Sequence, residues 1–228
     1  MTAPMEGHAG EQAGGRLDAR GAAAWIRRAA ELVSGEAERL TRLDAAIGDG
    51  DHGHNLHRGF TAAVAALPGD DELGETRPGK VLIAAGRAIV SKTGGASGPL
   101  YGTALRRAGK ALGDASEADA AAVGAALKAA LEGVQELGQA NEGDKTMIDA
   151  LAPAAAAYAA ALDGGADLAG SARAAADAAD AGAAATVPMQ ARKGRASYLG
   201  PRSTGHLDPG ASSTALVLRA LADVTGRE

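Results

Sequence analysis

Three aspartates lie close together in the segment LDAAIGDGDHGHN, at Asp44, Asp49 and Asp51. If a helix ends just before Gly48, Asp44 lies in its last turn, and the flexible backbone at Gly48 and Gly50 turns the other two side chains toward it. Converging carboxylates repel one another, and the C-terminal end of a helix disfavours anions, unless a cation lies among them. The spacing therefore predicts a site for a hard cation with oxygen ligands.

The identity of the cation is constrained by what surrounds the aspartates. An EF-hand loop would need an oxygen ligand where Gly53 stands and a bidentate glutamate near the end of the loop, and neither is present. Magnesium completed by phosphate oxygens and water fits better. A solvent-exposed Asp-Gly turn explains a short GDGD motif equally well. Zinc held by His52, His54 and His57 is a third alternative, which the harder carboxylates disfavour.

A second glycine-rich segment, SKTGGASGPLYGTAL, leads into a predicted helix. Gly94, Gly95 and Gly98 allow backbone amides to approach an anion, and Ser97 adds a hydroxyl at the start of the helix. The segment lacks the GK[ST] ending of a P-loop and the βαβ setting of a Rossmann fingerprint. It predicts either an anion site or an ordinary turn between helices.

A third segment, KGRASYLGPRSTGHLDPGASS, gathers basic side chains in a chain that is acidic overall. Such a loop suits an anion clamp, although it could equally be a solvent-exposed connection. A carboxylate cluster, an amide-rich helix start and a basic loop together are the parts of a metal–nucleotide site. No Ser-His-Asp triad and no covalent nucleophile can be placed. With the residue that precedes the segment, the basic residues are Arg192, Lys193, Arg195, Arg202 and His206.

The elements that must position these loops are helices. Alanine, the strongest helix former, is abundant, aromatic residues make up 2%, and no segment alternates as a strand would. We expect residues 1–15 to be disordered and residues 16–228 to form one all-α domain, a bundle of helices whose loops meet at one end. After a first helix near Trp25 that Gly35 interrupts, the expected helices are Glu36–Ile47, His54–Leu67, Gly79–Ser91, Gly98–Leu112, Ser116–Leu137, Lys145–Leu162, Ala166–Val187 and Ala211–Val224.

Charge and composition exclude several classes of protein. The formal net charge of −5 argues against a nucleic-acid footprint. No run of about 20 apolar residues suggests a membrane span, and the N-terminus does not have the pattern of a signal peptide. The absence of cysteine excludes disulfides, thiolate ligands and a cysteine nucleophile. We therefore expect a cytoplasmic protein.

Four segments in order resemble the signatures of the dihydroxyacetone kinase L subunit (DhaL) family: LDAAIGDGDHGHNLHRGF, GGASGPLYGTAL, GDKTMIDALAPA and MQARKGRASYLGPRSTGHLDPGASS. The resemblance implies a closed barrel of eight antiparallel helices with ADP or ATP bound by loops at one end. It also implies that Asp44, Asp49 and Asp51 hold two Mg²⁺ ions and that Arg195 is catalytic. The nucleotide contacts it implies are His52, Asn55, Ala96, Ser97, Gly138, Met147, Arg195, Asp208, Pro209 and Gly210.

The same resemblance implies partners. A separate K subunit would present dihydroxyacetone, a phosphocarrier M subunit would rephosphorylate bound ADP, and a homodimer is compatible with the family. Two alternatives stay open: an ATP-dependent kinase subunit for a related ketose such as a four-carbon sugar, and a non-catalytic helical module that senses nucleotide. A zinc hydrolase that uses the histidines is a third, weaker alternative.

Overall fold

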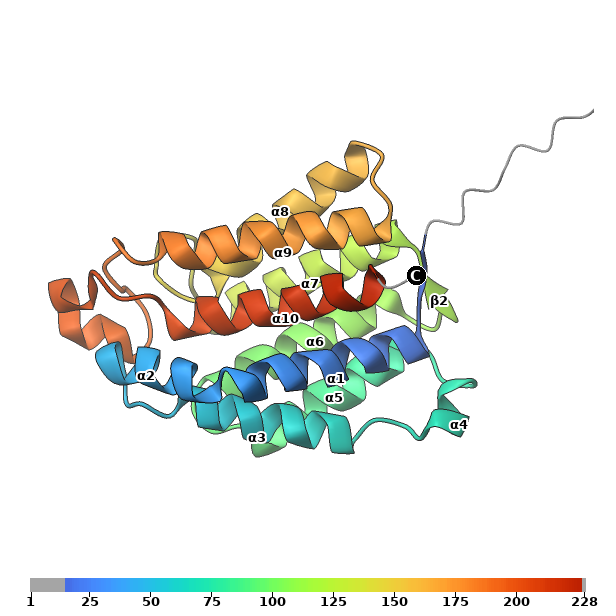
Figure 1. Ribbon diagram of the computed structural model, residues 1–228, viewed down its shortest axis with the longest axis horizontal. Helices are drawn as coiled ribbons and strands as arrows, with labels where there is room; N and C mark the ends of the chain where they lie inside the picture. Colours follow the sequence, from blue (N-terminus) through green and yellow to red (C-terminus); the bar gives the residue numbers. More distant parts are fainter. Residues whose placement is uncertain (1–14, 227–228) are drawn as a thin grey trace, which may run out of the picture.

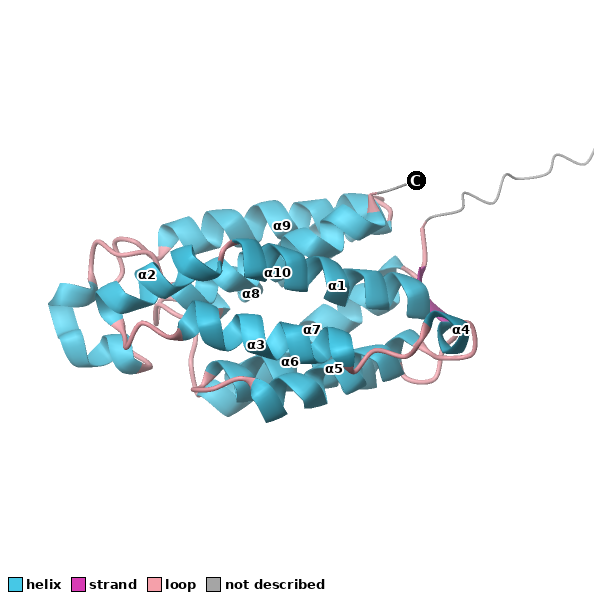
Figure 2. Cartoon of the chain, turned by 60° about the horizontal axis from the view of Figure 1, so that its bottom comes forward, coloured by secondary structure: helices cyan, strands magenta, loops and turns pink. Residues whose placement is uncertain are grey.

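The computed structural model describes residues 15–226, and these are predominantly helical (Figures 1 and 2). The all-α prediction is confirmed. The expected disordered extension lies, as far as residue 14, outside the described residues. The helices are α1 (Ala19–Gly35), α2 (Ala37–Ile47), α3 (His52–Ala65), α4 (Asp70–Leu73), α5 (Pro78–Lys92), α6 (Ser97–Leu112), α7 (Ala120–Gly138), α8 (Ile148–Asp163), α9 (Leu168–Ala185) and α10 (Pro209–Thr225), with a 3₁₀ segment η1 (Arg195–Ser203).

Eight of these helices follow one another around a ring of contacts. The order is α1, α3, α5, α6, α7, α8, α9 and α10, and α10 packs back against α1. Neighbours around the ring run in opposite directions, so every second helix begins at the same end of the molecule (Figure 1). Helix α2 lies at the end of the molecule where α3, α6, α8 and α10 begin, and it packs against α3 and α10. Loops that follow α2, α5, α7 and α9 therefore meet at one end.

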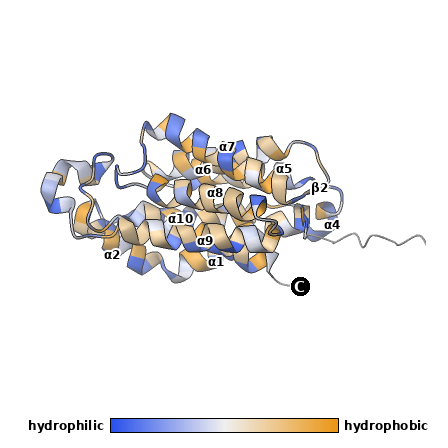
Figure 3. Ribbon diagram, turned by 90° about the horizontal axis from the view of Figure 1, so that it is seen from above, coloured by the Kyte–Doolittle hydropathy of each residue, from blue (hydrophilic) through white to orange (hydrophobic). Residues whose placement is uncertain are grey.

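Small residues let the helices approach closely. A Cβ atom built on Gly86 of α5 would lie 2.8 Å from the carbonyl oxygen of Gly102 on α6, so these two backbones are in direct contact. Larger side chains such as Ile26, Phe60 and Tyr158 are fully buried and fill the interior. Buried apolar side chains form one continuous core between the helices. The hydropathy colouring shows mostly apolar helices and more hydrophilic loops at the two ends (Figure 3). Within residues 15–226, no helix is both long and apolar enough to cross a membrane.

The start of α7 differs from the sequence prediction. We expected a helix from Ser116, but Asp119 is the N-cap, and its side chain accepts a hydrogen bond from the amide of Ala122. The two residues before it, β2 (Glu117–Ala118), pair antiparallel with β1 (Leu17–Asp18). The N-cap at Asp119 and the pairing of β2 with β1 together keep residues 117–118 extended. The predicted interruption at Gly35 is confirmed, because α1 ends there and α2 begins two residues later.

Candidate active site

A cavity of about 470 Å³ opens at the end of the bundle where α3, α6, α8 and α10 begin. The loops that the sequence singled out all contribute to its wall. Among the residues implied by the family resemblance, those that line the cavity are Asp44, Asp49, Asp51, His52, Ala96, Ser97, Gly138, Met147, Arg195, Asp208, Pro209 and Gly210.

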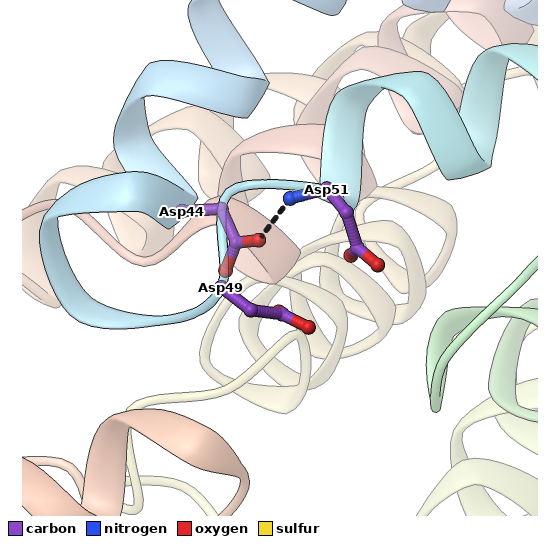
Figure 4. Close-up of side chains that lie close together, drawn as sticks. All are labelled: Asp44, Asp49 and Asp51. Atoms are coloured by element: carbon purple, nitrogen blue, oxygen red, sulfur yellow. Dashed lines mark hydrogen bonds between the residues drawn. The ribbon is translucent and has the colours of Figure 1, made fainter.

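The three aspartates gather at one side of this cavity (Figure 4). Each offers a carboxylate oxygen, and these oxygens lie within 4.8 Å of one another. Asp44, in the last turn of α2, accepts hydrogen bonds from the amides of Asp51 (2.9 Å) and His52 (3.2 Å), which fixes the loop between α2 and α3. Asp49 and Asp51 are exposed. Three hard oxygen donors at this separation, two of them open to solvent, fit a divalent cation such as Mg²⁺ that keeps water or phosphate ligands.

Four helix N-termini face the same cavity. His52 begins α3, Ser97 begins α6, Ile148 begins α8 and Pro209 begins α10, and all four residues line it. The first amides of a helix carry partial positive charge and lack partners within the helix. At α6 no side chain caps them. The antiparallel ring therefore collects four positive helix ends around one space, which suits a polyanion such as a polyphosphate.

A buried chain of hydrogen bonds orders the base of the site. The Ser97 hydroxyl lies 3.1 Å from Nδ1 of His52, whose Nε2 lies 2.8 Å from the Ser213 hydroxyl. The Tyr101 hydroxyl lies 2.7 Å from that of Ser213 and 2.9 Å from that of Thr214. Burial lowers the pKa of His52, although Asp44 and Asp51 oppose the shift, and raises the pKa of Tyr101 to about 12. Both rings are therefore neutral near pH 7, and the histidine acts as a hydrogen-bonding link between α3, α6 and α10.

The opposite wall of the cavity is apolar. Gly138 and Met147 lie there with Leu100, Val134 and Leu137. The last three were not singled out from the sequence, because leucine and valine at helical spacing look like ordinary core residues. A cavity with carboxylates at one side and an apolar wall at the other matches a ligand with a charged tail and a flat organic ring.

The basic loop contributes only part of its charge to the cavity. Arg195 forms an ion pair with Oδ2 of Asp49 at 3.1 Å, and Lys193 also lines the cavity. Arg192, Arg202 and His206 are exposed and do not line it. Of the five basic residues predicted for this loop, two therefore face the cavity.

The buried side chain of Lys145, which has no recognisable signal in the sequence, holds the basic loop in place. Lys145 is 1% exposed, and its ammonium group donates to the carbonyl oxygens of Thr186 (2.8 Å), Met189 (3.2 Å) and His206. All three of its donors are thus used. Burial lowers the pKa of Lys145, opposed by the charges of Asp208 and Asp149. No pattern in the sequence signals this role, because the three acceptors are backbone atoms.

Asp208 has two functions at the start of α10. Its Oδ2 accepts from the amide of Ala211 at 2.7 Å and so caps the helix, while the side chain lines the cavity. Burial raises the pKa of Asp208 to about 7, partly offset by the hydrogen bond from Ala211. The group is therefore partly protonated near neutral pH.

Asn55 and the alternative histidine zinc site are not arranged in the structure as the sequence suggested. Asn55 does not line it; its side chain lies under the glycine-rich turn, and its Oδ1 accepts from Arg58. The three histidines do not form a zinc site: His52 is buried, whereas His54 and His57 are exposed. Among the described residues, the three aspartates are the group whose ligand atoms converge.

Comparison with known proteins agrees with this geometry. The family model described as the DAK2 domain matches residues 46–223. The ADP-binding subunit DhaL of the PEP-dependent dihydroxyacetone kinase of Escherichia coli is 39% identical over 87% of this chain and 93% of its own length. The chain belongs to the DhaL family. Its relatives are named as kinases or kinase subunits, so DhaL-family membership makes it part of a phosphotransferase.

Two longer proteins contain the same domain. D-erythrulose kinase of Mycolicibacterium smegmatis is 39% identical over 92% of this chain, which spans 36% of that protein. The dihydroxyacetone kinase of C. freundii, solved in complex with AMP-PNP and Mg²⁺, superposes with a TM-score of 0.63 at 27% identity. The superposition covers 98% of this chain and 37% of that one. The DhaL fold therefore occurs both as a subunit of similar length and as about a third of a larger kinase.

Proposed function

We propose that this chain is the nucleotide-binding subunit of a dihydroxyacetone kinase. It would hold ADP or ATP with two Mg²⁺ ions and transfer the phosphoryl group to dihydroxyacetone bound on a separate K subunit. The observation that carries the proposal is the convergence of three carboxylate oxygens within 4.8 Å beside a cavity with an apolar opposite wall. The relatives named as ADP-binding subunits and the AMP-PNP and Mg²⁺ complex support it.

Each side of the cavity has a distinct part in this mechanism. Asp44, Asp49 and Asp51 would hold the metal ions, which neutralise phosphate charge when bound. The start of α6 at Ser97 would bind the phosphate oxygens through free backbone amides and the Ser97 hydroxyl. His52, whose amide already donates to Asp44, and Pro209, which has no N–H, would flank the phosphates. Gly138 and Met147 would contact the adenosine.

Arg195 is the candidate catalytic residue. Its guanidinium group reaches Asp49 at 3.1 Å, so it lies where the terminal phosphate would meet the metal ligands. From that position it can stabilise the negative charge that develops on the transferring group. Asp208, Pro209 and Gly210 would close the site, and Asn55 would act on the glycine-rich turn from beneath.

The acceptor and the donor come from other proteins in this proposal. An M subunit would rephosphorylate ADP without its release, so that the nucleotide serves as a resident cofactor. Mixing the purified chain with K and M subunits and phosphoenolpyruvate, in parallel with K subunit and ATP alone, tests the donor. Formation of dihydroxyacetone phosphate only in the first mixture supports the proposal, whereas equal turnover with free ATP contradicts this part of it. A homodimer and a cytoplasmic location stay predictions.

Nucleotide content gives the most direct test of binding. Purified protein is denatured, and the supernatant is analysed by ion-exchange chromatography. We expect ADP or ATP in near-stoichiometric amount. Protein free of nucleotide that also shows no affinity for added ADP and Mg²⁺ contradicts the proposal.

A kinase subunit for a related ketose is the second candidate. The observation that favours it is the 39% identity with D-erythrulose kinase, equal to that with the E. coli subunit. Supplying four-carbon ketoses with ATP and candidate acceptor subunits discriminates the two. Faster phosphorylation of a four-carbon ketose than of dihydroxyacetone would identify the four-carbon ketose as the substrate. The proposed nucleotide site would be the same in either case.

A further inference from the structure

A second concave surface lies on the outside of the bundle, where α6 runs between α5 and α7. It encloses about 430 Å³, within the range of small-molecule sites. Its floor is one face of α6, formed by Thr103, Arg106, Arg107 and Lys110, which are spaced about one helical turn apart. We call this surface the α6 groove. It shares Leu137 with the main cavity and otherwise has its own lining.

Glycines in the flanking helices recess the floor of the α6 groove. A Cβ atom on Gly86 of α5 would lie 2.9 Å from Cγ of Arg106, and one on Gly133 of α7 would lie 2.7 Å from Cγ of Arg107. The stems of the two arginines therefore lie across bare backbone on either side of α6. This contact restricts both stems, which lowers the entropy lost when their guanidinium groups bind a ligand.

The α6 groove carries a concentrated positive charge. Four cationic side chains line it, from Arg87, Arg106, Arg107 and Lys110, together with one carboxylate, that of Glu136. Arg107 pairs with Glu136. In the part of the chain that the structure describes, the other three cations have no carboxylate within ion-pairing distance. Four charges less one leave +3 in the groove of a chain whose formal charge is −5.

We propose that the α6 groove binds a small molecule that carries two phosphate groups. Two phosphates bring about three to four negative charges at neutral pH, which matches the excess in the groove. Guanidinium groups bind phosphate oxygens in pairs, and the Thr103 hydroxyl can donate a further hydrogen bond. Ile83 and Leu137 add apolar surface for an organic part. An acidic protein segment would need a far larger surface than this groove provides.

Calorimetric titration with inorganic pyrophosphate tests the proposal. The titration is done with a chelator and without Mg²⁺, so that the aspartate site is not filled. We expect saturable binding by the intact chain and at least tenfold weaker binding by the double variant Arg87→Gln/Arg106→Gln. The control Lys128→Gln/Arg173→Gln removes the same two charges from exposed positions outside the groove and should bind like the parent. Circular dichroism verifies that all variants fold.

The source of the two phosphates is distinguished by titrating a sugar bisphosphate and a nucleoside diphosphate under the same conditions. Tighter binding of either one than of pyrophosphate, lost in the Arg87→Gln/Arg106→Gln variant, identifies the organic part. Absence of pyrophosphate binding at millimolar concentration overturns the proposal. Equal affinity in the groove variant and the parent also overturns it, as does binding of an acidic peptide in place of pyrophosphate.

Discussion

Replacing Lys145 by methionine is the sharpest test of how the loop over the active site is held. Its ammonium group donates three hydrogen bonds to carbonyls of residues 186, 189 and 206, and the side chain is 1% exposed. Methionine fills much of the same volume but leaves all three carbonyls without this donor. The perturbation therefore isolates the hydrogen bonds from the packing.

The expected loss can be estimated from these contacts. A hydrogen bond to a charged group contributes about 1.5–3 kcal/mol, so three bonds set an upper bound of about 9 kcal/mol. Lys145 also lines the cavity, so water can reach some of the freed carbonyls. A buried acceptor left without its donor costs about 1–3 kcal/mol, so with water reaching some of the three carbonyls we expect a loss of unfolding free energy of about 2–5 kcal/mol.

Urea unfolding followed by circular dichroism measures this loss. The matched control is Lys128→Met on α7, because Lys128 is exposed and meets Glu132 only at 4.0 Å. This control should change the free energy of unfolding by less than about 0.5 kcal/mol. A change below about 1 kcal/mol for Lys145→Met would refute the role assigned to the buried lysine.

Three further variants probe other parts of the account. Burial raises the pKa of Asp208 from 3.8 to about 7, so the stability that this group contributes is complete below pH 3.8 and is lost as the pH rises through 7. Asp208→Asn keeps the helix cap but does not titrate. The fall in unfolding free energy between about pH 5.5 and 8 should therefore be about 2 kcal/mol smaller in this variant than in the parent. An unchanged pH profile would contradict the raised pKa of Asp208. Gly53→Ala places a methyl group against the Ala37 carbonyl and 2.6 Å from Thr41 Oγ1, so urea unfolding should show a loss of about 1–3 kcal/mol, and a stabilised variant would exclude the clash. Arg195→Gln should leave stability unchanged, because the side chain is 69% exposed, but slow phosphoryl transfer in the assay with K subunit by about a hundredfold; full activity would remove Arg195 from the mechanism.

Much of the fold could be predicted because helices leave strong local signals. Alanine-rich segments with apolar residues at helical spacing fixed most helix centres, and Gly35 marked a real interruption. The start of α7 was missed, because Asp119 is a better cap than Ser116 only once Glu117 and Ala118 pair with a segment a hundred residues away. That pairing depends on tertiary structure and has no local pattern.

The residues of the candidate site also fall into those that the sequence signals locally and those that it does not. The aspartates could be found because three carboxylates in one loop are costly without a cation, and the glycine-rich turn could be found from its backbone freedom. Lys145 and the apolar residues Leu100, Val134 and Leu137 could not, because their roles depend on which helix ends meet. Asn55 was expected as a nucleotide contact only through the family resemblance, and its side chain lies behind the glycine-rich turn and does not line the cavity.

The central claim is that Asp44, Asp49 and Asp51 bind divalent cations that in turn hold a polyphosphate. Calorimetric titration of nucleotide-free protein with ADP, with and without Mg²⁺, tests it most directly, using Asp49→Asn against the exposed control Asp114→Asn. We expect tight binding only with Mg²⁺, at least tenfold weaker in Asp49→Asn and unchanged in the control. Equal ADP affinity in the presence of chelator that persists in the Arg87→Gln/Arg106→Gln variant, or an Asp49→Asn variant that binds like the parent, would contradict the account.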